Sequence, residues 1–122
     1  MFKFGSFVQY RESSIGYRCL TGYFNAVGLV EIGDDVLCGG YINFTSGLRQ
    51  HSFNNPDLPF NKHPGSRTCI NIGSDVWIGN NCVICANIGN RVVIGAGSTV
   101  VTDCIDKTVY AGNPAKMLKE IK

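Results

Sequence analysis

Residues 72–84 have the sequence IGSDVWIGNNCVI. Isoleucine returns at every sixth residue, at Ile72, Ile78 and Ile84, and the fourth residue after each of the first two is small and apolar. A helix predicts apolar spacings of three and four, and a single strand predicts alternation. A period of six fits neither pattern. It indicates a flat coil with six-residue sides, in which the aliphatic residue points inward and glycine eases the backbone around the corner.

The same Ile-Gly pattern recurs along the chain, at Ile32, Ile88 and Ile94, with an earlier copy at Ile15. Such self-similarity at a fixed period is typical of repeat architectures, in which stacked turns bury a continuous ladder of aliphatic side chains. We therefore expect an all-β parallel β-helix. Before Ile32 the repeat is loose, so the first coils, within residues 1–29, are expected to be irregular.

One irregularity in the repeat makes a specific prediction. Ile84 and Ile88 are four residues apart instead of six, so two residues are missing between Cys85 and Val93. One corner of the coil must be tightened there.

Between residues 45 and 68 the repeat stops and the chain becomes polar and rich in Asn and Pro. A structureless stretch of this length inside a small domain is unusual enough to suggest a function. We expect it to be a loop extruded from the coil.

At the end of the chain, residues 114–121 are predicted to form a short α-helix. Asn113 can cap it, Pro114 suits its first position, and the residues that follow favour helix. Such a helix would seal the open end of the coil, whose strand edges would otherwise be unpaired. The expected organisation is thus one domain over residues 1–122, with coils and loop at 30–112 and a helix at 113–122.

Composition narrows the function classes. A net charge of +2 and the lack of a long basic run argue against a nucleic-acid protein. No apolar window reaches the roughly 18 residues of a membrane span, and the first residues do not resemble an export signal, so a cytoplasmic protein is expected. The six cysteines are then interpreted as reduced core residues.

Three segments carry a resemblance to a known family: IGSDVWIGNNCVI at 72–84, IGAGSTVVTD at 94–103 and VYAGNPAK at 109–116. They resemble the C-terminal half of the hexapeptide-repeat acetyltransferases. The loop sequence HSFNNPDLPF at 51–60 is most similar to the polysaccharide and lipopolysaccharide O-acetyltransferases. Taken as a whole, the resemblance is nearest to the sugar and polysaccharide O-acetyltransferases and to the maltose and galactoside acetyltransferases. The resemblance implies a left-handed coil, a homotrimer, acetyl-CoA as co-substrate and no metal.

The resemblance also implies a general base, at His51. A sugar hydroxyl is barely ionised at neutral pH, so its attack on a thioester needs a base, and a neutral imidazole is suited to that task. His63 matches nothing in the family motif and is interpreted as a loop or subunit-contact histidine. Asp57 is near His51 in sequence, but a residue that orients His51 is not identified.

For the coenzyme, the family's contacts fall on turn positions, on a tryptophan beside the cleft and on two lysines near the end of the chain. Lysine ammonium groups would meet phosphates as point charges. The positions are Trp77, Asn80, Ala96, Val101, Thr102, Lys116 and Lys119. Many members have lysine at the corner occupied here by Thr102 and Asp103, so one phosphate contact is expected to be missing.

Other functions remain to be weighed. Cys82 and Cys85 have the spacing of a metal or redox pair, but no second pair lies nearby and a structural zinc site needs four ligands. A γ-class carbonic anhydrase needs three histidines, and the chain has two. The alternatives kept open are a xenobiotic or amino-sugar N-acetyltransferase and a non-catalytic β-helix that serves as a scaffold or binding module.

Overall fold

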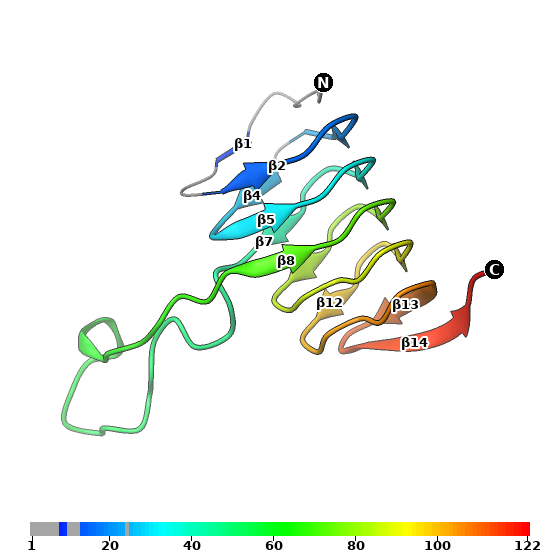
Figure 1. The fold of residues 1–122 in the computed structure, drawn as a ribbon. Coiled ribbons are helices and arrows are strands. Elements are labelled where there is room, and N and C mark those ends of the chain that lie inside the picture. The colour runs from blue at the N-terminus through cyan, green and yellow to red at the C-terminus, as the bar shows by residue number, and fades with distance from the viewer. Residues whose placement is uncertain (1–7, 10–12, 24) are drawn as a thin grey trace.

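The computed structural model describes residues 8–9, 13–23 and 25–122. Part of the predicted irregular segment 1–29 therefore lies outside the described residues. The described chain winds into stacked coils, with a long loop projecting to one side (Figure 1).

Short strands form three sheets, which we call faces A, B and C, and all strand pairs but one are parallel. Face A consists of β3 (Leu20–Thr21), β6 (Leu37–Cys38), β9 (Trp77–Ile78), β11 (Val93–Ile94), β13 (Thr108–Gly112) and β14 (Ala115–Glu120). Face B consists of β1 (Val8–Gln9), β4 (Asn25–Val27), β7 (Asn43–Phe44), β10 (Val83–Ile84) and β12 (Thr99–Val100). Face C consists of β2 (Ser14–Ile15), β5 (Val30–Ile32) and β8 (Ile70–Ile72). The predicted parallel β-helix is confirmed.

The strand register explains the four-residue step in the sequence. Ile72 pairs with Ile88, and Ile88 pairs with Cys104, so each of these coils contains 16 residues. The steps from face C to face A and from face A to face B each span six residues, as in Ile72, Ile78 and Ile84. The step from face B back to face C, from Ile84 to Ile88, spans only four. The tight corner predicted near Cys85 is confirmed, and it recurs in the next coil, where Val100 is followed four residues later by Cys104.

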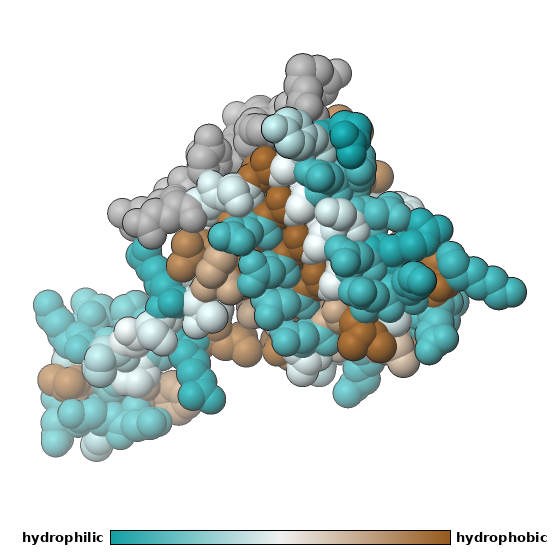
Figure 2. Space-filling view, in the orientation of Figure 1, coloured by the Kyte–Doolittle hydropathy of each residue, from teal (hydrophilic) through white to brown (hydrophobic). Residues whose placement is uncertain are grey.

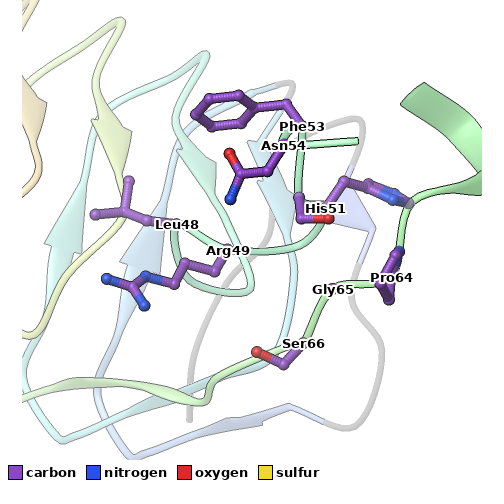
Figure 3. A pocket seen from close by; sticks show the side chains of 9 residues that line it. Leu48, Arg49, His51, Phe53, Asn54, Pro64, Gly65 and Ser66 are labelled. Carbon is purple, nitrogen blue, oxygen red and sulfur yellow. The ribbon is translucent and has the colours of Figure 1, made fainter. Parts of the chain in front are cut away.

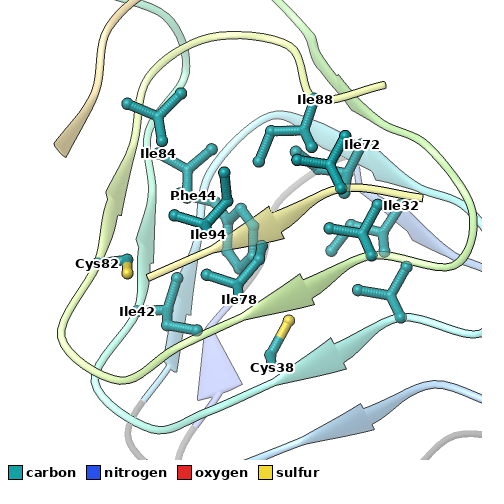
Figure 4. Packing of buried hydrophobic residues seen from close by; sticks show 14 of the residues in the cluster. Ile32, Cys38, Ile42, Phe44, Ile72, Ile78, Cys82, Ile84, Ile88 and Ile94 are labelled. Atoms are coloured by element: carbon teal, nitrogen blue, oxygen red, sulfur yellow. The ribbon is translucent and has the colours of Figure 1, made fainter. Parts of the chain in front are cut away.

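The core is a ladder of inward side chains that fills the triangular coil (Figure 4). Ile78 and Ile84 are fully buried, as is Cys82 in the small position between them. Burying one such aliphatic side chain contributes about 1.5–3 kcal/mol. The repeat is therefore the pattern of core packing, one layer for each coil.

At the corners, polar side chains stacked from coil to coil accept hydrogen bonds from backbone N–H groups that strand pairing leaves without a partner. The N–H of Ser74 donates to Asn90 Oδ1 and the N–H of Asn90 donates to Asp106 Oδ1, both at 2.8 Å. At the neighbouring position of the same corner, Asp75 and Arg91 adopt left-handed backbone conformations, and their side chains form an ion pair of 2.7 Å. These corners turn without glycine at the left-handed position, because the polar ladder stabilises the turn.

The predicted C-terminal helix at 114–121 is wrong. Residues 115–120 form β14, which turns back at Gly112 and pairs antiparallel with β13, from Gly112↔Ala115 to Thr108↔Glu120. An isolated helix of eight residues is marginal, whereas β13 offers an open edge whose backbone groups need partners. Strand pairing therefore overrides a weak helix propensity. The edge is covered by a strand.

The predicted extruded loop is confirmed. It leaves the coil after Phe44, returns at Ile70, and contains one 3₁₀ turn, Phe60–Lys62. Figure 2 shows it as a mostly hydrophilic lobe set apart from the coils. Among the described residues, no helix has the length and apolar character needed to cross a membrane.

Candidate active site

Two legs of the loop run side by side and hold the candidate site. The N–H of Ser66 donates to the carbonyl of Arg49 at 2.8 Å, and the N–H of Ser52 donates to that of Pro64 at 2.7 Å. The legs touch most closely at Gly65, where an added Cβ would collide with the carbonyl of Gln50 and lie 2.6 Å from the backbone nitrogen of His51. Glycine is required there because the two backbones pass with no room for a side chain.

His51 lies on the outgoing leg, exposed to solvent. Its Nδ1 is 3.3 Å from the backbone carbonyl oxygen of His63. A carbonyl can only accept, so Nδ1 carries the proton of the neutral ring, and Nε2 is left with its lone pair. The ring is thereby oriented by backbone, and the carboxylate of Asp57 does not supply that contact: the described Asp57 interaction is its own N–H donating to Asn55 Oδ1.

His63 is buried inside the loop, with 4% of its surface exposed. Its Nε2 lies 3.0 Å from the carbonyl of Leu58, its Nδ1 lies 3.4 Å from Ser52 Oγ, and its ring is tilted against Phe60. The ring cross-links the loop to itself, which fits the interpretation of His63 as a loop histidine. It also places the carbonyl that His51 uses.

Residues of both legs line a hollow of about 650 Å³ (Figure 3). It is open to solvent, and its wall combines an apolar ring, amide and hydroxyl groups, a cation and the candidate base. The lining residues are Leu48, Arg49, His51, Ser52, Phe53, Asn54, Pro64, Gly65 and Ser66. Such a mixture suits a polar small molecule with several hydroxyl groups.

A second hollow, of about 300 Å³, lies where the loop joins the coil and shares Leu48, Arg49 and Ser66 with the first. Val101 lines this second hollow, and Thr102 follows it at the same exposed corner after β12. Val101 is thus the predicted coenzyme contact that the described chain places next to the loop.

Asn80 and Ala96 lie at a different corner, between faces A and B. The N–H of Gly40 donates to Asn80 Oδ1 at 2.7 Å, and the N–H of Gly97 donates to the Asn80 carbonyl at 2.8 Å, so Asn80 and the turn of Ala96 are stacked one coil apart. A hollow of about 440 Å³ adjoins Asn80 and is walled by glycine backbone and by Tyr23 and Tyr41.

The remaining predicted contacts lie on face A. Trp77 is 55% exposed and lines a hollow of about 290 Å³ together with Leu37 and Ile121. Lys116 and Lys119 are exposed on β14, so they stand on a strand and not on the predicted helix. In the described chain, the hollow of His51 contains none of the seven predicted coenzyme contacts.

The CxxC pair does not form a recognisable metal centre. Cys82 points into the core, where its thiol lies 3.2 Å from the carbonyl of Gly95, while Cys85 is half-buried at the outer corner. Burial raises the pKa of Cys82. The described residues include no group of three or more His, Cys, Asp or Glu side chains that could hold a metal ion.

Three features of the site were missed at the sequence level. They are the carbonyl of His63, the close approach at Gly65 and the placement of Arg49 in the wall of the hollow that His51 lines. The Pro64-Gly65 dipeptide is a turn signal that marks the returning leg. The other two depend on loop packing that has no signature in the sequence.

No protein-family model matches the chain. Over 98 residues the chain is 35% identical to WbbJ of Escherichia coli (strain K12), which is named as a lipopolysaccharide biosynthesis O-acetyl transferase; the match covers 75% of this chain and 50% of WbbJ. The match thus spans about half the length of WbbJ. The matches to four other curated relatives span 23–28% of the length of each relative.

Solved structures resemble the fold of this chain over nearly its whole length. A maltose O-acetyltransferase from Clostridium difficile 630 superposes with a TM-score of 0.87 at 27% identity, covering 100% of this chain and 67% of that one. A hexapeptide-repeat acetyltransferase of Vibrio cholerae, solved with acetyl-CoA, gives a TM-score of 0.84 at 25% identity, covering 99% and 68%. These likenesses include the coils, the loop and the final strand. The chain belongs to the hexapeptide-repeat acetyltransferases, which have the left-handed parallel β-helix fold.

Proposed function

We propose that the protein transfers the acetyl group of acetyl-CoA to a hydroxyl of a sugar, polysaccharide or similar small acceptor, with His51 as general base. The observation that carries the proposal is the contact of His51 Nδ1 with the His63 carbonyl, 3.3 Å away. It leaves Nε2 ready to accept a proton on a ring that lines a polar hollow. The relatives named for O-acetyl transfer support the choice of a hydroxyl acceptor.

In the proposed reaction, Nε2 of His51 takes the proton of the acceptor hydroxyl as its oxygen attacks the thioester carbonyl carbon. The tetrahedral intermediate then collapses, the carbon–sulfur bond breaks, and the leaving thiolate takes the proton from the imidazolium. The products are an acetyl ester and the free thiol of CoA, so the histidine ends the cycle neutral. Proton transfer of this kind contributes about a hundred- to ten-thousandfold to the rate.

We further propose that the active unit is a homotrimer with its sites between neighbouring chains. In one chain, the loop bearing His51 projects away from the coils, and the corner of Asn80 and Ala96 lies outside its hollow (Figure 1). A loop that extends from one chain can meet that corner on the next. The coenzyme would then contact Trp77, Asn80 and Ala96, together with Val101 and Thr102 at the other corner, and its phosphates would meet Lys116 and Lys119.

The enzyme proposal is tested with acetyl-CoA and a panel of hydroxyl and amine acceptors. Acetyl-CoA should raise the melting temperature, because any ligand selective for the folded state does so. Thiol release should then require a hydroxyl acceptor. A preference for amine acceptors would favour the N-acetyltransferase alternative, and acetyl-CoA that neither binds nor reacts would favour the scaffold alternative.

A mixing experiment tests the shared site. His51→Ala and Ala96→Trp should each be inactive, the first through loss of the base and the second through a blocked corner. If each site takes His51 from one chain and Ala96 from another, randomly mixed trimers should recover about a quarter of the native activity. Mixtures that stay inactive, although native mass spectrometry shows trimers that contain both variants, would place both residues in one chain's site.

A further inference from the structure

The hollow beside His51 contains a cation and, among its lining residues, no carboxylate. The cation is Arg49, which lies two residues before His51 on the same leg of the loop. Its backbone carbonyl is held by the N–H of Ser66 at 2.8 Å. Arg49 and His51 are both among the residues that line this hollow, although their side chains leave the leg in different directions (Figure 3).

The guanidinium of Arg49 is exposed and not engaged by a carboxylate in the described part of the chain. The described ion pairs join Arg18 to Asp35 and Arg91 to Asp75. Asp103, in the adjoining hollow, uses Oδ1 to accept the N–H of Asn87 at 3.0 Å. The planar fork of Arg49 is therefore available for a ligand, and it matches carboxylate and phosphate oxygens.

The surroundings of Arg49 strengthen this reading. Residues 45–69 include Arg49, Lys62 and Arg67 against a single acid, Asp57. The side chains of Asn54, Ser52 and Ser66 add hydrogen-bonding groups to the hollow, and Phe53 adds an exposed ring. Together they can hold the hydroxyl groups and the apolar face of a sugar while the cation holds an attached anion.

We propose that the acceptor is a saccharide with an anionic group, a carboxylate or a phosphate, near the reacting hydroxyl, and that Arg49 binds this group. The inference rests on the proposed acetyl transfer. The anion is assigned to the acceptor because the pantetheine arm of CoA separates its phosphates from the thioester. Arg49 lines the hollow of the base, so its ligand is assigned to the acceptor that occupies that hollow.

The test compares matched acceptors: glucose, glucuronate and glucose 1-phosphate. Thiol release from acetyl-CoA gives kcat/KM for each acceptor with the native protein, Arg49→Gln and Arg67→Gln. Arg67 is an exposed arginine of the same loop that does not line the hollow, so Arg67→Gln is the matched control. Binding of the same three probes without acetyl-CoA is followed through the NMR amide shifts of Ser52, Asn54 and Ser66.

At least one anionic probe should exceed glucose by about tenfold or more in kcat/KM and in binding, as expected for a charge-assisted pair. Arg49→Gln should abolish that preference, while Arg67→Gln should keep it. Preference for glucuronate alone identifies a carboxylate, and preference for glucose 1-phosphate alone identifies a phosphate.

Two results would overturn the inference: no preference for either anionic probe, or a preference that survives Arg49→Gln. A raised KM for acetyl-CoA in Arg49→Gln with an intact acceptor preference would assign Arg49 to the donor instead. If the proposed acetyl transfer itself is wrong, no acceptor will be acetylated. In that case the NMR amide shifts still show whether the anionic probes bind better than glucose and whether Arg49→Gln removes that difference.

Discussion

His51 Nδ1 lies 3.3 Å from the backbone carbonyl of His63, while His63 presents its own Nε2 to the carbonyl of Leu58 at 3.0 Å. Both acceptors are backbone oxygens, which cannot donate. The two neutral imidazoles must therefore hold their protons on opposite nitrogens, Nδ1 in His51 and Nε2 in His63. The loop thus gives its two histidines different chemistry: one is a proton acceptor at Nε2 and the other is a structural cross-link.

The opposite tautomers are directly measurable. The ¹⁵N spectrum of the imidazoles, recorded at a pH where both rings are neutral, should show a protonated Nδ1 for His51 and a protonated Nε2 for His63. Assignment uses His51→Ala and His63→Ala, each of which removes one set of signals. A proton on Nε2 of His51 would contradict the orientation on which its role as a base depends.

Gly65→Ala should inactivate the protein while sparing the coil. The added methyl group would collide with the carbonyl of Gln50 and force the two legs apart, which moves His51 relative to the hollow. We expect kcat/KM for acetyl transfer to fall at least about tenfold, since small misplacements of catalytic groups are costly.

The melting temperature should change little, because the loop lies outside the core ladder. Arg67→Ala, two residues further along the same leg and exposed, is the control and should retain activity. Full activity in Gly65→Ala would show that the close approach of the legs is not required.

Buried thiols make the protein sensitive to alkali. Burial raises the pKa of Cys38 from its ordinary value of 9.0 to about 12, with further contributions from Cys19 and Cys82. Between these values the unfolded chain has lost a proton that the folded chain keeps. Stability is therefore complete below pH 9 and falls as the pH rises toward 12.

Urea unfolding at a series of pH values above about 8 measures this loss. Cys38→Ala should show a shallower decline with pH, although its stability at neutral pH is lower because core packing is lost. Cys69→Ala, at a half-buried position outside the core, should keep the native slope. An unchanged slope in Cys38→Ala would mean that this thiol does not govern the alkaline transition.

The coils could be predicted from sequence because each coil repeats the same packing problem. Inward positions must be aliphatic or small, so Ile72, Ile78 and Ile84 mark the three successive faces of one coil, and the step to Ile88 reveals its shortened side. The last segment was misjudged because its structure depends on a partner. Residues 115–120 have good helix propensity in isolation, and only the open edge of β13 makes them a strand.

The site was less accessible to prediction. His51 could be singled out by the family resemblance, but its orienting partner is a main-chain atom of His63, and main-chain groups leave no trace in residue identity. Arg49 belongs to the hollow only because the loop legs pair at Ser66. Predicted coenzyme contacts such as Asn80 and Val101 lie on separate corners of the coil. This separation could not be predicted, because a sequence motif records positions and not the distances between them.

The role of His51 as general base is the central claim, and one comparison tests it most directly. Acetyl-CoA thiol release is measured in the presence of saccharide acceptors for the native protein and for His51→Ala, with the Kd of acetyl-CoA determined in parallel. We predict that kcat falls about a hundred- to ten-thousandfold while the Kd is unchanged, because the side chain acts on the proton and not on coenzyme binding. Transfer by His51→Ala at the native rate would contradict the account.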